Sequence, residues 1–274
     1  MQFRFYDKPG LWMTPAAQHA LRQTLLHIAA TSLRPVPDYQ CLSSAPDALD
    51  DKLIVVAHAG DPATTPAIAF TSAFFIAVSA LAPPRPVLHT GLTVVDPAHR
   101  RRGVVMQLFA QVAARVFPRY GRDGLWVTCL AEVPSSLGLV TQYLEAVFPS
   151  PEAAPGPPPE THRAIARAVS EGERARMLIS PGAVLDEERF VFRGSNDWSE
   201  GECFKKDPRD ERWLHREPEW NRFFSDMLKA GSGDEVLQVG FCSRERAEMV
   251  VRMLAGREMK EKKKTKKKAA AARL

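Results

Sequence analysis

Three consecutive arginines and a glycine at positions 100–103 are the residues whose types and spacing first suggest chemistry. They lie between a β-rich run that ends at Val95 and a stretch from Val104 onward in which apolar residues recur at helical spacing. A glycine there lets the backbone approach a ligand, and a helix start offers free N–H groups and a positive dipole end. The junction is suited to hold phosphate. The alternative is a solvated turn, which we favour less because the charges cluster at a strand-to-helix junction that contains a glycine.

Two regular elements position this junction. Residues 85–95 alternate in side-chain type and are rich in β-branched residues, which predicts a buried strand. Pro97 has no N–H to donate to a sheet, so the strand must end before it. The helix that follows has one apolar face, made of Val104, Val105, Leu108, Val112 and Val116.

The remaining chain alternates between predicted helices and strands. Thr14 and Pro15 have the residue types of a helix cap and a first helical position. Further strands are expected at 52–59, 67–81, 124–131, 189–193 and 234–242, and further helices at 134–148, 161–178, 210–228 and from the cap Ser243 to Gly256. Residues 149–159 contain six prolines and one glycine, which predicts a linker or loop over 149–160.

The order of residues 95–104, VDPAHRRRGV, resembles the acyl-CoA pyrophosphate loop of the GCN5-related N-acetyltransferase superfamily. That motif reads Gln/Arg-x-x-Gly-x-Gly/Ala and follows a strand. Arg100 and Gly103 fit its first and fourth positions, whereas Val105 stands where the family has Gly or Ala. A β-branched side chain there would crowd the diphosphate or shift it toward the arginines.

A second motif extends the resemblance to residues 14–148. Ser136, Tyr143 and Phe148 follow the spacing that the family shows along its second helix, here the one expected at 134–148. The resemblance implies an α/β fold with a mixed, splayed sheet flanked by helices, and here an elaborated C-terminal region. The parallel strands 87–95 and 125–130 would separate and admit the pantetheine arm of CoA. The residues assigned to the cofactor are Val94, Val95, Arg100, Arg101, Arg102, Gly103, Val104, Val105 and Ser136.

The resemblance also implies a division of the chain. Residues 1–148 would form the acyl-CoA-binding core, and residues 161–258 would form a C-terminal part that completes the sheet. Residues 259–274 are expected to be a disordered, lysine-rich tail.

Two catalytic residues follow from the same resemblance. His89 lies six residues before Val95, where relatives often carry a Glu or His base, and strand alternation predicts that both side chains share one face. Tyr143 stands where many members have a tyrosine that protonates the departing sulfur. Each has a structural alternative: His89 as a core or rim histidine, Tyr143 as a side chain filling the helix–sheet interface. Ser136 could contact CoA or cap its helix.

The predicted function is CoA-dependent N-acyl transfer, with acetyl-CoA as cosubstrate and an unidentified amine as acceptor. No metal is expected, because the four cysteines, at 41, 129, 203 and 242, lack the spacing of a metal site. A non-catalytic CoA-binding or protein-interaction module on the same fold is the alternative, motivated by Val105.

The basic charge of the chain belongs to its tail. Seven lysines and Arg273 against Glu261 give residues 259–274 a net charge of +7, so the formal +5 of the whole chain leaves −2 for the body. A nucleic-acid-binding body is therefore not expected, although the lysine tail could recruit the protein to nucleic acid. No stretch has the length of a membrane helix.

An intracellular location is expected, since the sequence has no secretion signal. The cytoplasm is the default compartment. The last three residues, Ala-Arg-Leu, resemble a peroxisomal address, and the lysine tract at 260–268 resembles a nuclear one.

Overall fold

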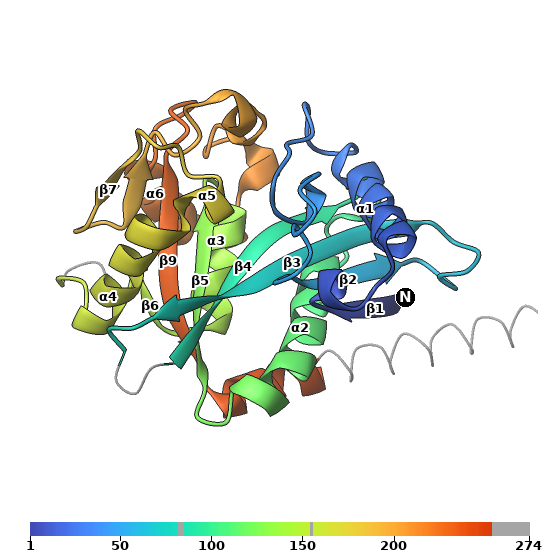
Figure 1. Ribbon diagram of the computed structural model, residues 1–274. Coiled ribbons are helices and arrows are strands. Elements are labelled where there is room, and N and C mark those ends of the chain that lie inside the picture. The colour runs from blue at the N-terminus through green and yellow to red at the C-terminus, as the bar shows by residue number, and fades with distance from the viewer. Residues whose placement is uncertain (82–84, 154–155, 254–274) are drawn as a thin grey trace, which may run out of the picture.

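A computed structural model describes residues 1–81, 85–153 and 156–253 of the chain. Its centre is one nine-stranded sheet in the order β1-β2-β3-β4-β5-β9-β8-β7, with β6 also paired to β9 (Figure 1). The strands are β1 (Gln2–Asp7), β2 (Leu53–His58), β3 (Ala67–Val78), β4 (Arg85–Val95), β5 (Leu125–Ala131), β6 (Glu145–Phe148), β7 (Val184–Asp186), β8 (Val191–Arg193) and β9 (Glu235–Cys242). Strands from both halves of the sequence therefore form one sheet.

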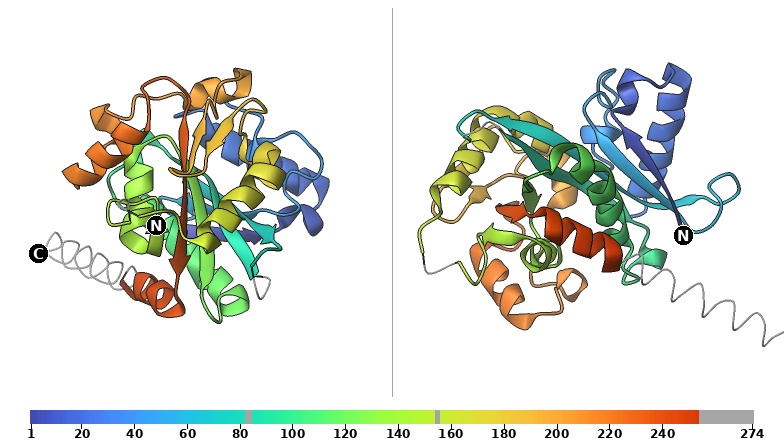
Figure 2. Two further views of the ribbon diagram at one scale, coloured as in Figure 1. Left: turned by 90° about the vertical axis from the view of Figure 1, so that its left-hand side faces the viewer. Right: turned by 90° about the horizontal axis from the view of Figure 1, so that it is seen from below.

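Helices cover both faces of this sheet (Figure 2). Successive residues of a strand point to opposite faces, so each face carries its own set of apolar side chains for helices to cover. Val56 of β2 packs with helix α1 (Pro15–Ala29), whereas the neighbouring Val55 packs with helix α2 (Val104–Tyr120). We call these sides the α1 face and the α2 face. Apolar side chains on every second position of the central strands thus build two cores.

The C-terminal half continues both layers. Helices α4 (Glu160–Ala168) and α5 (Arg174–Met177) contribute to the cluster around Phe74, on the α1 face. Helices α3 (Pro134–Tyr143) and α6 (Pro218–Met227) contribute to the cluster around Ala131, on the α2 face. A helix over residues 244–253 follows β9, and Val250 packs there against Ala110 of α2.

The sheet divides between β4 and β5, its only parallel neighbours among the described strands. Four residue pairs align the two strands, from Val87 opposite Trp126 to Thr90 opposite Cys129. Beyond Thr90 the rest of β4 pairs with β3 alone. The split opens toward the loop at residues 96–103.

A bulge in β4 accompanies the split. Gly91 and Leu92 together lie opposite Ser72 of β3, where the register shifts by one residue. The Gln40 side chain fills the bulge: its Oε1 accepts hydrogen bonds from Leu92 N–H (3.0 Å) and from Ser72 Oγ (2.9 Å). A Cβ at Gly91 would lie 2.3 Å from this oxygen, so any other residue there would displace the Gln40 amide from the bulge.

Several local predictions are confirmed. Thr14 caps α1 by accepting a hydrogen bond from Ala17 N–H (3.3 Å), and Ser243 caps the helix over 244–253 through Arg246 N–H (3.1 Å). The expected end of that last helix, at Gly256, lies outside the described residues, as do the lysine tract and the terminal tripeptide.

Two predicted helices were too long. The helix expected over 134–148 ends at Tyr143, because residues 145–148 pair with β9 as β6 instead. The helix expected over 210–228 is regular only from Pro218, preceded by a short turn of helix at Glu211–Trp213. A proline is favoured at a first helical position, and it marks the start of α6.

The predicted fold class is confirmed. A mixed sheet, split between two parallel strands and flanked by helices, is the architecture that the resemblance to the GCN5-related N-acetyltransferases implies.

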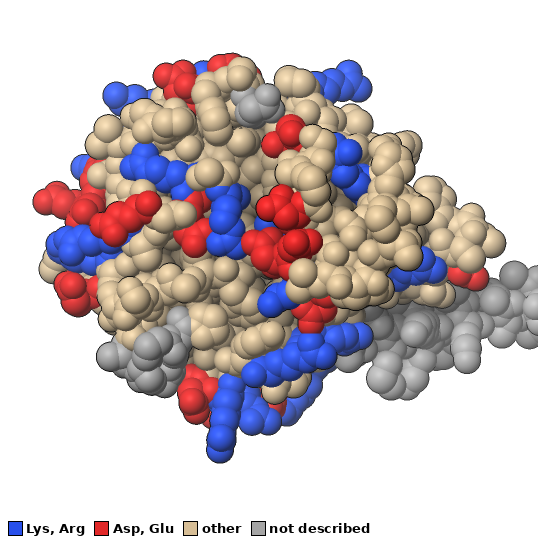
Figure 3. All heavy atoms as spheres, viewed as in Figure 1, with Lys and Arg blue, Asp and Glu red and all other residues tan. Residues whose placement is uncertain are grey.

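Acidic and basic side chains are intermixed over much of the face shown in Figure 3.

Candidate functional site

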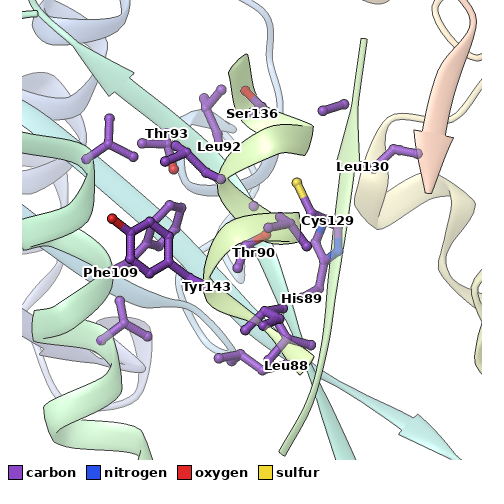
Figure 4. Close-up of a pocket in the computed structure, with 18 of the residues that line it drawn as sticks. Leu88, His89, Thr90, Leu92, Thr93, Phe109, Cys129, Leu130, Ser136 and Tyr143 are labelled. Atoms are coloured by element: carbon purple, nitrogen blue, oxygen red, sulfur yellow. The ribbon is translucent and has the colours of Figure 1, made fainter. Parts of the chain in front are cut away.

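A cavity of about 450 Å³ occupies the split between β4 and β5. Figure 4 shows labelled side chains of α2, α3, β4 and β5 around it. Its wall on the α2 face includes Val105, Met106, Phe109, Ser136, Leu139 and Tyr143. At the other end, the polar lining residues are Tyr39, Glu132, Asn196, Lys206 and Glu235. The cavity therefore draws on both faces of the sheet.

The backbone at the start of α2 can accept an anion. Gly103 has φ of 72° and no atom within 4 Å of the position a Cβ would take. The first intrahelical bond runs from Gln107 N–H to the Gly103 carbonyl (3.2 Å), so the N–H groups of residues 104–106 have no partner within the helix. Open space, free N–H groups and the dipole fit the diphosphate of CoA.

The three arginines have different positions. The Arg100 guanidinium donates to the Val95 carbonyl (3.2 Å) and to Ser32 Oγ (2.7 Å), so it braces the loop against β4 and the end of α1. Burial lowers the pKa of Arg100. Arg101 and Arg102 are exposed, and Arg101 has a left-handed backbone with φ of 59°. These two remain available to an anion at the loop.

The four valines that the resemblance assigned to the cofactor do not all reach the cavity. Val94 packs in the core of the α1 face, and Val95 and Val104 pack in the core of the α2 face. Val105 lines the cavity and also contacts the α2-face core. Its branched side chain therefore narrows the cavity close to the loop at residues 96–103.

His89 is buried on the α1 face. Its Nδ1 forms a hydrogen bond with Thr128 Oγ1 (3.0 Å), and its ring lies 5.0 Å from the Phe74 ring. Burial, with Arg176 and Lys52 nearby, lowers the pKa of His89 to about 3. These contacts favour the structural alternative, and the assignment of His89 as a base stays a prediction.

The expectation that His89 and Val95 share a face is wrong. Val95 packs on the α2 face, together with Leu88 rather than His89. The bulge at Gly91 inserts one residue into β4, which reverses the alternation between the two positions.

Ser136 and Tyr143 both line the cavity from α3. The cap of α3 is Val133, which lies three residues before Ser136, so the alternative reading of Ser136 as a helix cap is wrong. Tyr143 is half-buried and packs against the cluster formed by Ala110 of α2 and Val250. Figure 4 shows its ring beside Phe109, away from His89.

Glu132, which the sequence reasoning missed, directly follows β5 and lines the cavity. It is 5% exposed, and neither carboxylate oxygen has a hydrogen-bond partner. Burial raises its pKa to about 8; Glu235 adds to the rise, and the backbone and ammonium of Lys206 oppose it. The available signal was an ionisable residue at the carboxyl end of a strand beside the split.

Glu235, at the start of β9, is a second acid that the sequence reasoning missed. Its Oε2 accepts a hydrogen bond from Ser195 Oγ (2.6 Å). Burial raises the pKa of Glu235 to about 7. Nothing in the spacing of the sequence connects positions 132 and 235, because only the sheet order brings β5 and β9 together.

Comparisons with known proteins give similarity in structure only. No family model matches the sequence, and no curated protein matches it. An acetyltransferase from Vibrio fischeri is 14% identical, with a TM-score of 0.33 over 47% of this chain and 94% of that one. NAA60 of Arabidopsis thaliana, solved in complex with acetyl-CoA, is 13% identical with a TM-score of 0.35, over 52% of this chain and 82% of the other.

The NatC complex bound to Gag peptide and CoA is also similar, at 15% identity and a TM-score of 0.34, over 52% of this chain and 82% of that one. These structures are acetyltransferases, and the match leaves about half of this chain uncovered.

Residues 1–81, 85–153 and 156–253 contain no group of three His, Cys, Asp or Glu side chains that could hold a metal ion. Within the same ranges, no helix has both the length and the apolar character that crossing a membrane requires.

Proposed function

We propose that the protein is a CoA-dependent N-acyltransferase, which moves an acetyl or similar acyl group to an amine by direct attack. The observation that carries this proposal is the cavity in the split sheet. It runs from Val105 and Met106, in the first turn of α2, to the acids Glu132 and Glu235. Such a passage suits a long cosubstrate that must reach an acceptor across the sheet.

In this proposal the loop holds the diphosphate of CoA. The N–H groups of residues 104–106 would donate to it, and Arg101 and Arg102 would add positive charge. Ser136 and the apolar wall made by Val105 and Phe109 would contact the pantetheine arm. When bound, an acyl-CoA supplies a thioester carbonyl carbon that an amine can attack.

Glu132 is our candidate for the general base. An amine reaches this site mostly as ammonium and must lose a proton before it can attack. A carboxyl group with a pKa of about 8 holds such a proton far better than an ordinary glutamate. The nitrogen–carbon bond then forms as the carbon–sulfur bond breaks, and the leaving thiolate needs a proton. Tyr143, at the cavity wall on the α2 face, is the candidate donor.

A non-catalytic CoA-binding module is the second candidate, and Val105 is the observation that favours it. Its side chain narrows the cavity where the family has Gly or Ala. Two measurements separate the candidates.

The first measurement is thermal unfolding with acetyl-CoA and with CoA. A ligand at 100 times its Kd raises the unfolding free energy by about 2.7 kcal/mol. The second is release of the CoA thiol in the presence of a mixture of amines. Binding with thiol release supports the enzyme, binding alone supports the module, and no shift with either ligand refutes both.

A further inference from the structure

The connection between β8 and α6 lines one end of the cavity with Asn196, Phe204 and Lys206. Phe204 packs against the core of the α1 face, and its ring meets the Tyr39 ring edge-on at 6.0 Å. Trp213 lies under the Arg100 guanidinium, 5.7 Å from its ring centroid. This connection therefore reaches from β8 across to the α1–β2 segment and to the arginine loop, and we call it the cover (residues 195–213).

The cover brings Lys206 to the cavity as a cation without a counterion. Its Nζ lies 4.8 Å from the Trp213 ring centroid and 5.9 Å from the Phe204 ring centroid. No carboxylate of the described residues lies within ion-pair distance of it, although Glu132 and Glu235 line the same cavity. Adjacent Lys205, which does not line the cavity, pairs with Asp197 (3.1 Å) and Glu202 (2.6 Å). Lys205 is therefore neutralised by two carboxylates, whereas the Lys206 ammonium has no carboxylate partner among the described residues.

Glu132 is the complementary group at this end. Its carboxyl is buried, lines the cavity, and has both oxygens without a hydrogen-bond partner. Buried polar groups in native proteins are nearly always paired, and both oxygens of this carboxyl are open to a partner that enters the cavity. Lys206 and Glu132 act on each other electrostatically but form no ion pair with each other or with another described side chain. One cation and one carboxyl at the same end of the cavity match a ligand that carries both signs of charge.

We propose that the acceptor is a small amino carboxylate, whose carboxylate binds Lys206 and whose amino group faces Glu132. This inference rests on the proposed function. A phosphate-bearing acceptor fits less well, since a dianion would meet one ammonium and two acids. A peptide acceptor fits less well too, because Lys206 would then face a neutral amide instead of a free carboxylate.

The test uses the full-length protein with acetyl-CoA and a panel of acceptors, measured by thiol release. The panel contains the standard amino acids, the decarboxylated amine that corresponds to each, and short peptides with a free N-terminus. We expect at least one amino acid to be used about 10- to 100-fold better, in kcat/KM, than its decarboxylated amine.

The variant Lys206→Met tests the assigned contact. It should remove the preference for the carboxylate while leaving the CoA-induced thermal shift unchanged. Lys206→Arg should retain much of the preference, and it also provides a folded variant if Lys206→Met does not fold. Lys205→Met is the matched control and should behave as wild type, because Lys205 does not line the cavity.

The outcomes separate this inference from the proposed function. An absent CoA shift in the wild type refutes the proposed function itself. With CoA bound, two results overturn only the amino-carboxylate acceptor: better use of decarboxylated amines or peptides, or an unchanged preference in Lys206→Met. CoA binding with use of no acceptor in the panel overturns both the acceptor and the enzyme, and supports the non-catalytic module. Weaker CoA binding in Lys206→Met with the preference intact would assign Lys206 to CoA instead.

Discussion

Thr90 and Cys129 are the last aligned pair between β4 and β5, and the cavity opens directly beyond them. Thr90 Oγ1 donates to the Thr128 carbonyl (2.9 Å), which fixes the two strands together at this point. The split therefore ends at Thr90 and Cys129, on the side away from the arginine loop. Any ligand that passes between the strands must do so on the side of the arginine loop.

We expect Gly103→Glu to abolish CoA binding. The added carboxylate would enter the open space beside the free N–H groups and repel the diphosphate. The same substitution at Gly231 is a matched control, since Gly231 also has positive φ (67°) and no atom within 4 Å of a Cβ. Both variants should lose about 1–2 kcal/mol of stability from backbone strain. Equal CoA affinity in the two variants, measured by titration calorimetry, would remove the loop from the site.

Glu132→Gln should lower kcat by about 10²- to 10⁴-fold, the usual contribution of a proton-transfer group. In the wild type, kcat/KM should rise with pH until about 8, because the base acts only when deprotonated. The variant should lose this ionisation from the pH profile. A variant with the wild-type profile would show that the base lies elsewhere.

The same carboxyl should destabilise the folded protein at high pH. Its folded pKa of about 8 exceeds the ordinary value of 4.5, so the folded state holds a proton that the unfolded state has lost. The unfolding free energy contributed by this group therefore falls between pH 4.5 and 8.

Glu132→Gln should remove that fall. The stability gain over wild type should be absent at pH 4 and reach on the order of a few kcal/mol above pH 8, since one pKa unit is worth about 1.4 kcal/mol. Denaturant unfolding at several pH values measures this difference. A gain that does not change with pH would contradict the raised pKa.

Tyr143→Phe tests the proposed acid. It keeps the ring that packs against Ala110 and Val250 and removes only the hydroxyl, so stability and CoA binding should be preserved. We expect kcat to fall by about 10²-fold or more if the hydroxyl protonates the leaving sulfur. Unchanged turnover in stopped-flow or steady-state assays would show that Tyr143 contributes packing only and is not the proton donor.

His89→Ala distinguishes the two roles of His89. As a packed residue with a pKa near 3, it should cost about 2–4 kcal/mol of stability and leave kcat within about tenfold of wild type. The measurement pairs denaturant unfolding with steady-state kinetics. A loss of activity of about 10²-fold or more in a folded variant would restore its assignment as the base.

The sequence alone determined the features that depend on neighbouring residues. Thr14 before Pro15 specified the start of α1, and Pro97 and Gly103 marked the end of β4 and the start of α2. The resemblance of residues 95–104 led from this junction to the split sheet. Caps, turns and periodicity depend on interactions between residues a few positions apart, so the local sequence is enough to predict them.

Tertiary structure decided what lies across the split. The bulge at Gly91 depends on Gln40, more than fifty residues earlier, and it reversed the predicted face of His89. Glu132, Glu235 and Lys206 meet at one cavity only because β5 pairs with β9 and the cover folds back over the end of the split. Burial and unpaired charge are properties of that assembled space, and no spacing along the chain encodes them.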